Sequence, residues 1–386
     1  MPHICGLIAE YNPFHNGHLY HLREAKRLTG ADYTVAVMSG DFTQRGLPAV
    51  VDKYRRARMA LEAGVDLVLE LPVYYATGSA EVFAAGAVSL LESLGCVTDL
   101  VYGCESGDAA PLRALAKIFA SEPGEYSVFL KNELKTGKNY PAAREAALRK
   151  YLLLHPESFP EEAFSDAAGL LSFPNNILGI EYEKALISLG SSIKSLGIPR
   201  NDSGHYASGE MLRKALAAGD RSALSDQLPE SSLPLLDYTA DFSDFLPLIR
   251  YRLLSLSEEE LCGYADVTAE LAARLKKNIS DPLSAVSKNY TRARLTRALI
   301  HILLDIKKAP DTSYIRVLGF RRGSDILRLI KDSRLDGGPV CVTKLSDAPD
   351  EFWSEDSFAA SVYNQIISEK YGLTLPDEYR AGVVMV

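Results

Sequence analysis

The sequence contains little cysteine. Its five cysteines are scattered and none forms a Cys-x-x-Cys pair; they are Cys5, Cys96, Cys104, Cys262 and Cys341. This pattern favours reduced, mostly buried thiols of a cytosolic protein and supports neither a zinc site nor a disulfide framework. Long apolar runs are also missing, since the longest is far short of the roughly 20 residues that a membrane helix needs. No cationic segment precedes the first apolar stretch, so we expect a cytoplasmic protein without a secretory signal or a membrane partner.

The charge is unevenly distributed along the 386 residues. The whole chain carries a net charge of −8, which by itself argues against a polyanionic partner. Residues 274–334, however, contain 15 Lys and Arg residues against five Asp residues. A basic segment of this kind can bind a phosphate backbone locally, whatever the total charge.

The first hundred residues alternate between strand-like and helical patterns. Short apolar runs predict strands at residues 3–9, 33–38, 65–71 and 100–102, and helical spacing at residues 16–28, 53–63 and 80–94 separates them. Strands joined by helices of this length form right-handed βαβ units with a parallel sheet. In such sheets ligands bind at the carboxyl ends of the strands, so the loops that follow the strands are the first candidates for a site.

The remainder of the chain is expected to be mostly helical. Helical patterns cover residues 109–189, 211–217 and 245–306, with a short strand at 193–196 and two more at 314–318 and 340–343 that flank a helix around Ile326. Residues 220–244 are rich in Ser, Pro, Leu and acidic residues, which is typical of a domain boundary. We therefore predict an α/β, Rossmann-like domain at 1–219, a boundary at 220–244 and a mainly helical domain at 245–386.

The strongest local feature is residues 9–18, Ala-Glu-Tyr-Asn-Pro-Phe-His-Asn-Gly-His, which join the first predicted strand to the first predicted helix. Two histidines three residues apart at a helix start can face one ligand. The helix start adds free N–H groups and a positive dipole, which favour phosphate, and Gly17 lets a nucleotide approach the backbone. Imidazoles can donate to an α-phosphate as charge builds up in an in-line displacement. The position after a strand weighs against the alternative, a turn with two surface histidines.

This segment resembles the His-x-Gly-His motif of the nucleotidyltransferase superfamily, which includes class I aminoacyl-tRNA synthetases and pantetheine-phosphate adenylyltransferase. The longer string is more similar to one family within it, the bacterial tRNA(Met) cytidine acetate ligases. Further stretches fit that family in the right order over most of the chain: Ser-Gly-Asp-Phe-Thr-Gln-Arg-Gly at 39–46, Asp-Leu-Val-Leu-Glu-Leu-Pro at 66–72, Pro-Asn-Asn-Ile-Leu-Gly-Ile-Glu-Tyr at 174–182 and Tyr-Ile-Arg-Val-Leu-Gly-Phe at 314–320.

The resemblance implies a two-step reaction. ATP and acetate form acetyl-adenylate and pyrophosphate, and the acetyl group is then transferred to N4 of the wobble cytidine of elongator tRNA(Met). His15 and His18 are implied as catalytic residues that stabilise charge on the α-phosphate, and Mg²⁺ is a candidate metal. Carried over by position, the ATP-binding residues are Leu7, Ile8, Ala9, Glu10, Tyr11, Asn12, Pro13, Phe14, His15, Asn16, Gly17, His18, Leu19, Tyr20, Gly103, Asn175 and Arg200.

Three of these positions also have an ordinary structural interpretation. Gly103 ends a predicted strand, where a turn glycine is common. Asn175 follows Pro174 and precedes a helical run, so it can simply cap that helix. Arg200 lies in a turn-rich stretch, where most arginines are solvated.

The superfamily's second motif is usually rich in Ser and Thr and ends in Ile-Arg or Leu-Arg at a helix start. Here residues 208–213 read Ser-Gly-Glu-Met-Leu-Arg. Ser208 can cap the helix and Arg213 can reach a phosphate. Glu210 stands where a Thr is expected, and a carboxylate beside a triphosphate is unfavourable unless it points away or holds a cation.

The loop at residues 39–46 follows the second predicted strand. Gln44 and Arg45 are candidates for contacts to acetate or a phosphate, Arg45 by a two-pronged contact. Asp41 either accepts the cytidine amino proton or stabilises the turn. Lys53 lies at a helix start, where a cation opposes the helix dipole, so it either contacts an anionic ligand or faces solvent.

The candidate nucleic-acid surface lies in the basic stretch. Residues 288–297 have a helical pattern that places Arg294, Arg297 and His301 on one face with Tyr290. A basic face with one aromatic suits phosphates and a stacked base; a solvated amphipathic helix is the alternative, and the family resemblance favours tRNA. The tRNA-binding candidates are Lys288, Tyr290, Arg292, Arg294, Arg297 and Arg316.

Two other functions remain open at the level of sequence. A small-molecule adenylyltransferase shares the His-x-Gly-His chemistry but leaves the basic C-terminal stretch unexplained. A tRNA-binding protein with an inactive nucleotide site explains that stretch but gives the two histidines no role. Acetate-dependent exchange of pyrophosphate into ATP distinguishes the first from an acetate ligase, and His18→Ala distinguishes the second.

Overall fold

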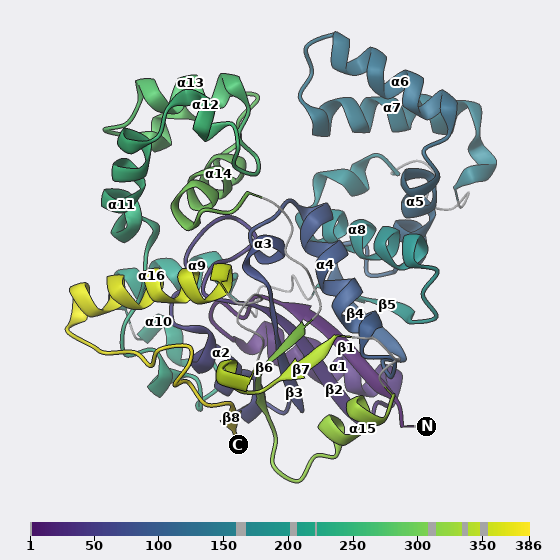
Figure 1. Cartoon of the computed structure of the whole chain (residues 1–386). Coiled ribbons are helices and arrows are strands. Elements are labelled where there is room, and N and C mark those ends of the chain that lie inside the picture. The colour runs from purple at the N-terminus through teal and green to yellow at the C-terminus, as the bar shows by residue number, and fades with distance from the viewer. Residues whose placement is uncertain are drawn as a thin grey trace.

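A computed structural model describes residues 2–159, 167–200, 207–220, 222–307, 314–333, 339–347 and 354–386. Its centre is a twisted sheet of eight strands within this described part, in the order β5-β4-β1-β2-β3-β6-β7, with β8 paired to β6 (Figure 1). The strands are β1 (Ile4–Ala9), β2 (Tyr33–Ser39), β3 (Leu67–Leu71), β4 (Asp99–Cys104), β5 (Lys194–Pro199), β6 (Tyr314–Phe320), β7 (Val340–Val342) and β8 (Val384–Met385).

The five strands from β1 to β5 are parallel, as the alternation of strands and helices predicts. The side chains of β1 to β4 are mostly buried on both faces, which is the usual condition of a parallel sheet, whereas the edge strand β5 is largely half-buried or exposed. In β2, for example, Val35 and Val37 pack on one face while Ala36 and Met38 pack on the other. The carboxyl ends of these strands therefore meet along one edge, which is where the predicted nucleotide loop lies.

Strand β6 extends this sheet by pairing antiparallel with β3, and β7 and β8 add to β6 in parallel. These residues belong to the stretch predicted as a mainly helical C-terminal domain. The sheet is therefore shared between the two ends of the chain, and the division into domains at residues 220–244 stays a prediction. Within this stretch Tyr238 is buried, and its hydroxyl donates to Asp52 Oδ2 at 2.7 Å.

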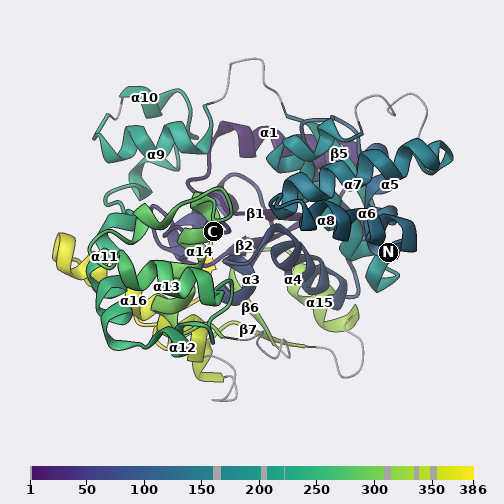
Figure 2. The same ribbon diagram turned by 90° about the horizontal axis from the view of Figure 1, so that it is seen from above.

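Helices cover both faces of the sheet and form a further helical layer (Figures 1 and 2). The helices of the described residues are α1 (Asn16–Thr29), α2 (Lys53–Glu62), α3 (Val73–Ala76), α4 (Ala80–Ser93), α5 (Ala110–Ser121), α6 (Gly124–Lys135), α7 (Tyr140–Leu154), α8 (Pro174–Leu189), α9 (Gly209–Ala217), α10 (Ser222–Ser225), α11 (Phe242–Ser255), α12 (Glu258–Leu261), α13 (Ala269–Lys277), α14 (Arg292–Leu304), α15 (Ile326–Ser333) and α16 (Ser354–Tyr371). One face is covered by α1, α2 and the C-terminal helices, and the other by α4, α5, α8 and α15.

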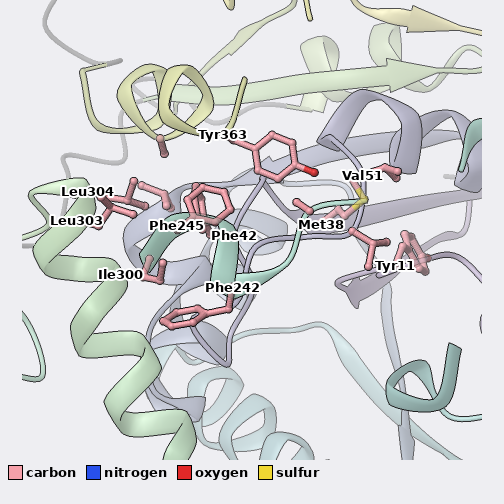
Figure 3. Packing of buried hydrophobic residues seen from close by; sticks show 14 of the residues in the cluster. Tyr11, Met38, Phe42, Val51, Phe242, Phe245, Ile300, Leu303, Leu304 and Tyr363 are labelled. Carbon is pink, nitrogen blue, oxygen red and sulfur yellow. The ribbon is translucent and has the colours of Figure 1, made fainter. Parts of the chain in front are cut away.

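The C-terminal helices are held to the sheet through the loop that follows β2. Phe42 of this loop contacts the rings of Phe245 in α11 and Tyr363 in α16, with centroid distances of 5.5 and 6.2 Å (Figure 3). The hydroxyl of Tyr363 donates to the carbonyl of Ala49 at 2.8 Å. Fully buried aromatic contacts of this kind contribute beyond their buried area, so the helical layer fixes the loop that borders the predicted site.

Gly46 marks the tightest contact between this loop and α14. A Cβ atom there would overlap the backbone nitrogen of Arg297, and its φ of +64° is in the left-handed region. We expect Gly46→Ala to lower the free energy of unfolding by about 2 kcal/mol or more, from backbone strain plus overpacking. Thermal and urea unfolding measure this.

Gly30→Ala is the matched control for that prediction. Gly30 has nearly the same φ, +61°, but no other residue lies within 4 Å of the place that a Cβ would take there. This variant carries only the left-handed strain, which costs about 1–2 kcal/mol. Equal losses of stability in the two variants would contradict the close approach of the loop to α14.

Two features bear on the expectations from composition. Among the described helices, none is long and apolar enough to cross a membrane. The five cysteines are thiols rather than disulfides, and burial is complete only for Cys5 and Cys104, while Cys262 is exposed. The expectation of mostly buried thiols is therefore wrong for Cys262, which is exposed at the residue that follows α12.

Candidate active site

The predicted nucleotide loop bends the chain from β1 into α1. Tyr11 takes a left-handed conformation with φ of 48°, and such strain is found where the surrounding structure holds it in place. The side chains of Leu7, Tyr11 and Phe14 are buried in the core. These three members of the predicted ATP-binding loop therefore support its shape, while the residues from His15 onward begin the helix.

His15 and His18 form a reciprocal cap at the start of α1. Nδ1 of His15 accepts from the backbone N–H of Gly17 at 3.0 Å, and Nδ1 of His18 accepts from the backbone N–H of His15 at 3.3 Å. The two rings are stacked with a centroid distance of 3.8 Å. Because each Nδ1 is an acceptor, a neutral imidazole carries its proton on Nε2. Both histidines therefore offer an Nε2–H donor.

Burial keeps both histidines neutral near pH 7. Desolvation, with help from the positive charges of Arg200 and Arg213, lowers the pKa of His15 to about 4. Desolvation and the neighbouring His15 lower the pKa of His18 well below its usual value. The pair thus donates hydrogen bonds without carrying charge, and the positive charge at the site comes from the two arginines.

The start of α1 differs from the prediction in one respect. The backbone N–H of Asn16 donates to the carbonyl of Gln227 at 2.9 Å, and that of Gly17 is taken by His15. The expectation of free N–H groups for a phosphate is therefore wrong for these two positions, because the histidine cap and the 226–227 segment already satisfy them. The donors that this cap leaves over are the imidazole Nε2–H groups.

The start of the second predicted motif lies against the first, next to the loop that leads into α1. Ser208 caps α9 by accepting from the N–H of Met211 at 3.3 Å. Gly209 has Nε2 of His15 within 4.0 Å of the place where a Cβ would be. Arg213 donates to the carbonyl of Asn12 at 3.0 Å. The starts of two helices, α1 and α9, therefore converge on the histidine pair.

Glu210 does not point into this site. Its carboxylate pairs with Lys214 one helical turn away at 2.8 Å, and its side chain is 59% exposed. The hydrogen bond from Lys214 lowers the pKa of Glu210. The unfavourable contact that the sequence suggests between this carboxylate and a triphosphate is thus avoided by its orientation.

A third group of predicted residues gathers at the carboxyl ends of β4 and β5. Glu105 follows β4 and accepts from the side-chain amide of Asn175 at 2.6 Å and from the backbone N–H of Asn176 at 2.8 Å. Arg200 lies 3.9 Å from the same carboxylate and approaches Gly103 through its aliphatic stem. Sequence reasoning missed Glu105, although an acidic residue facing a helix start is a recognisable signal.

The loop after β2 reaches the same area. Glu10 accepts from the backbone N–H of Gln44 at 2.8 Å, and the Gln44 side chain donates to the carbonyl of Gly78 at 3.1 Å. Arg45 is exposed and its charge acts on both Arg213 and Glu210. Asp41 is buried and accepts from the N–H of Lys53, so the structure favours its role in the turn.

Arg56 is a second residue that sequence reasoning missed. Its guanidinium is fully buried and donates to the carbonyls of Glu10, Ser39, Gly40 and Val51. It therefore ties the loop after β1 to the loop after β2. Nothing in the local pattern around Arg56 marks it, because its partners come from two other segments of the chain.

Lys53 is not available to a ligand. Its side chain is 1% exposed and its Nζ lies 2.8 Å from Glu70 and 2.9 Å from Glu378. Both sequence-based alternatives, an anionic ligand and a solvent-facing lysine, are therefore wrong. The positive charge of Lys53 is unfavourable at the start of α2, and the carboxylates of Glu70 in β3 and Glu378 near the C-terminus balance it.

The basic stretch is only partly a surface. Tyr290 is buried and its hydroxyl contacts Thr268 at 2.7 Å, so it is no platform for a base. Arg297 pairs with Asp266 at 2.9 Å and is mostly buried, and Arg316 is buried against the Tyr54 hydroxyl. His301 is buried between Ala265 and Thr77. Lys288 and Arg292 are exposed, and Arg294 is half-buried over the ring of Tyr290.

Among the residues that the structure describes, no group of three or more His, Cys, Asp or Glu side chains is arranged to hold a metal ion. The histidine pair supplies neutral donors and Arg200 and Arg213 supply positive charge, beside the carboxylates of Glu10 and Glu105 that hold the surrounding loops. Such a set binds and polarises phosphate oxygens by hydrogen bonds and charge.

Comparison with known proteins finds close relatives over nearly the whole chain. The tRNA(Met) cytidine acetate ligase of Acetivibrio thermocellus is 39% identical over 380 residues, covering 89% of this chain and 88% of the relative. That of Clostridium perfringens is 39% identical over 388 residues, covering 94% of both chains. The crystal structure of Thermotoga maritima TmcAL bound with alpha-thio ATP is 32% identical, has a TM-score of 0.89, and is matched over 100% of this chain and 99% of the other.

The strand order and the histidine pair at the first strand-to-helix turn define a nucleotidyltransferase, and the model of the HIGH Nucleotidyl Transferase family matches residues 2–374. Within that class, the chain belongs to the family of the tRNA(Met) cytidine acetate ligases.

Proposed function

We propose that this protein activates acetate with ATP and transfers the acetyl group to N4 of the wobble cytidine of elongator tRNA(Met), in the cytoplasm. The observation that carries the proposal is the stacked pair of neutral histidines at the start of α1, with Nε2 of His15 facing Gly209 at the start of α9. The relatives' names and the ATP analogue in the Thermotoga maritima structure support the choice of substrates.

In the first step an oxygen of acetate attacks the α-phosphorus of ATP, and the bond to pyrophosphate breaks. His15 and His18 donate to the α-phosphate oxygens as negative charge builds on them. Arg200 and Arg213 lie close enough to lower the pKa of His15, so they are placed to balance the charge of the phosphates. Ser208, Gly103 and Asn175 complete the proposed nucleotide site, and Gln44 and Arg45 are the proposed contacts to phosphate or acetate.

In the second step the cytidine N4 attacks the acetyl carbonyl carbon and the bond to AMP breaks, with loss of a proton from N4. An exocyclic cytosine amine is a weak nucleophile, so holding it next to the mixed anhydride supplies much of the rate. Lys288, Arg292 and Arg294 are the remaining candidates for tRNA contacts. Lys53, Tyr290, Arg297 and Arg316 do not belong to the proposed contacts because they are buried in protein interactions.

The test is mass spectrometry of tRNA incubated with the purified protein, ATP and isotopically labelled acetate, with and without Mg²⁺. We expect labelled N4-acetylcytidine at the wobble position of elongator tRNA(Met), together with acetate-dependent exchange of pyrophosphate into ATP. Exchange that does not depend on acetate would favour a small-molecule adenylyltransferase. Absence of both activities, with tRNA binding retained, would favour a non-catalytic tRNA-binding protein.

A further inference from the structure

The helical hairpin α6–α7 meets the basic loop before α14. The hairpin stands out from the body on the side opposite α11–α13 (Figure 1). At its tip, the Asn139 side chain donates to the carbonyl of Lys288 at 3.3 Å. Two exposed segments that are 149 residues apart in the sequence therefore form one surface.

The charge of this surface is positive on both sides of the contact. Lys135 and Lys138 flank the hairpin tip, and Lys288 and Arg292 are exposed on the other segment. Within the described part of the chain, Lys135, Lys288 and Arg292 make no ion pair with a carboxylate. The nearest acidic group on the hairpin, Glu133, is buried and already paired with both Lys138 and Lys150, so it leaves the surface basic.

Tyr140 supplies the exposed aromatic ring that Tyr290 does not. It is the first residue of α7, directly after Asn139, and it is 54% exposed. A large aromatic left in solvent beside basic side chains is typical of a platform on which an unpaired base stacks.

The basic loop on the other side is fixed before any ligand binds. Ser287 and Tyr290 exchange backbone hydrogen bonds across a tight turn, and the Arg294 guanidinium lies over the Tyr290 ring while donating to the carbonyl of Asn289. This turn presents Lys288 at the surface. A preformed loop loses less conformational entropy when it binds.

Helix α14 links this surface to the active site. It begins at Arg292, and one turn later the hydroxyl of Thr296 donates to the carbonyl of Arg45 at 2.5 Å. Four residues of helix rise about 6 Å. A nucleic-acid strand bound at Arg292 is thus close to the loop after β2, which contains Arg45 and borders the histidine pair.

We infer that the tip of α6–α7 and residues 287–292 together bind a single-stranded segment of the tRNA substrate, with phosphates on Lys135, Lys288 and Arg292 and a base stacked on Tyr140. This inference rests on the proposed function for the identity of the RNA. The occupant is an RNA because unpaired basic side chains match a phosphate backbone, and the single exposed ring matches one base.

The experiment compares Lys135→Glu, Tyr140→Ala and the double variant with wild type in filter binding to elongator tRNA(Met) over a range of salt concentrations. We expect the double variant to bind at least about tenfold more weakly, since stacking and a phosphate contact are both lost. Lys135→Glu is expected to reduce the slope of log K against log salt by about 1. Acetate-dependent exchange of pyrophosphate into ATP stays at the wild-type rate, because no tRNA takes part in it.

Arg149→Glu is the matched control. Arg149 is exposed on the same hairpin, near the far end of α7, and pairs with Glu145. Wild-type tRNA affinity in this control, with weak binding in the tip variants, supports the inference. Unchanged affinity in the tip variants, or an equal loss in Arg149→Glu, overturns it. A failure of the proposed function appears separately, as wild-type protein that binds tRNA but acetylates no cytidine.

Discussion

His15→Asn and His18→Asn are expected to lower the rate of acetate-dependent exchange of pyrophosphate into ATP by a factor of about 100 to 1000 each. Removing one preorganised donor to a developing negative charge has this order of effect. The substitution is chosen because the Asn side-chain oxygen takes the place of Nδ1 of the imidazole. The helix cap is therefore kept, while the Nε2–H donor is lost.

His15→Gln is the complementary variant. Its amide nitrogen reaches the place of Nε2, but it has no acceptor at the position of Nδ1. We expect it to retain more activity than His15→Asn and to lose about 1 kcal/mol of stability, the usual cost of a lost N-cap. If His15→Asn were fully active while His15→Gln was inactive, the histidine would serve only as a cap.

The pH dependence follows from the neutral state of these rings. The pKa of His15 is about 4 in the folded protein, because burial disfavours the imidazolium, against about 6.5 in the unfolded chain. The unfolded state therefore takes up a proton first as the pH falls below 6.5, and stability is lost between pH 6.5 and pH 4. Urea unfolding of His15→Asn should show a weaker loss over this window. Its exchange activity should stay low at every pH, since no titration restores the donor.

The sequence predicts the part of the site that is local. The strands from β1 to β5, the turn into α1 and the start of α9 follow from apolar runs, helical spacing and cap residues that lie next to one another. The convergence of His15, Arg200 and Arg213 follows less directly, because it depends on strand order as well as on motifs.

The errors lie where a partner comes from a distant segment. The helical pattern places Tyr290 on one face with Arg294, but α14 begins at Arg292 and the ring turns inward to Thr268. The buried guanidinium of Arg56 and the carboxylate of Glu105 have partners on other loops, which no local pattern reveals. Tertiary contacts thus decide which polar residues face a ligand and which hold the loops together.

Lys53→Met is expected to lower the free energy of unfolding by about 3–5 kcal/mol, the usual cost of removing one partner of a buried ion pair. The substitution leaves the carboxylates of Glu70 and Glu378 buried without the ammonium that lies within 2.9 Å of both. Arg58→Met in the same helix is the surface control. Its pair with Glu62 is solvent-exposed, so its loss costs at most about 1 kcal/mol.

The cost of Lys53→Met should grow with pH. Burial raises the pKa of Glu70 to about 8 even with Lys53 present, so in the folded state this carboxyl accepts a proton more readily than in the unfolded chain. The stabilisation from that proton is complete below about pH 4.5 and is lost as the pH rises through 8. Without the lysine the pKa of Glu70 rises further, so both proteins lose stability alike up to about pH 8 and only the wild type stops losing it there; urea unfolding at about pH 7 and about pH 9.5 measures the difference.

Glu70→Gln added to Lys53→Met separates the ion pair from other effects of the methionine. We expect the double variant to recover part of the lost stability, because one uncompensated carboxylate is removed. Exchange assays at a temperature where the variants are folded should give unchanged KM values for ATP and acetate. Lys53 is buried and paired with Glu70 and Glu378, away from the proposed nucleotide contacts. A raised KM in a fully folded Lys53→Met protein would instead place the ammonium in contact with a substrate.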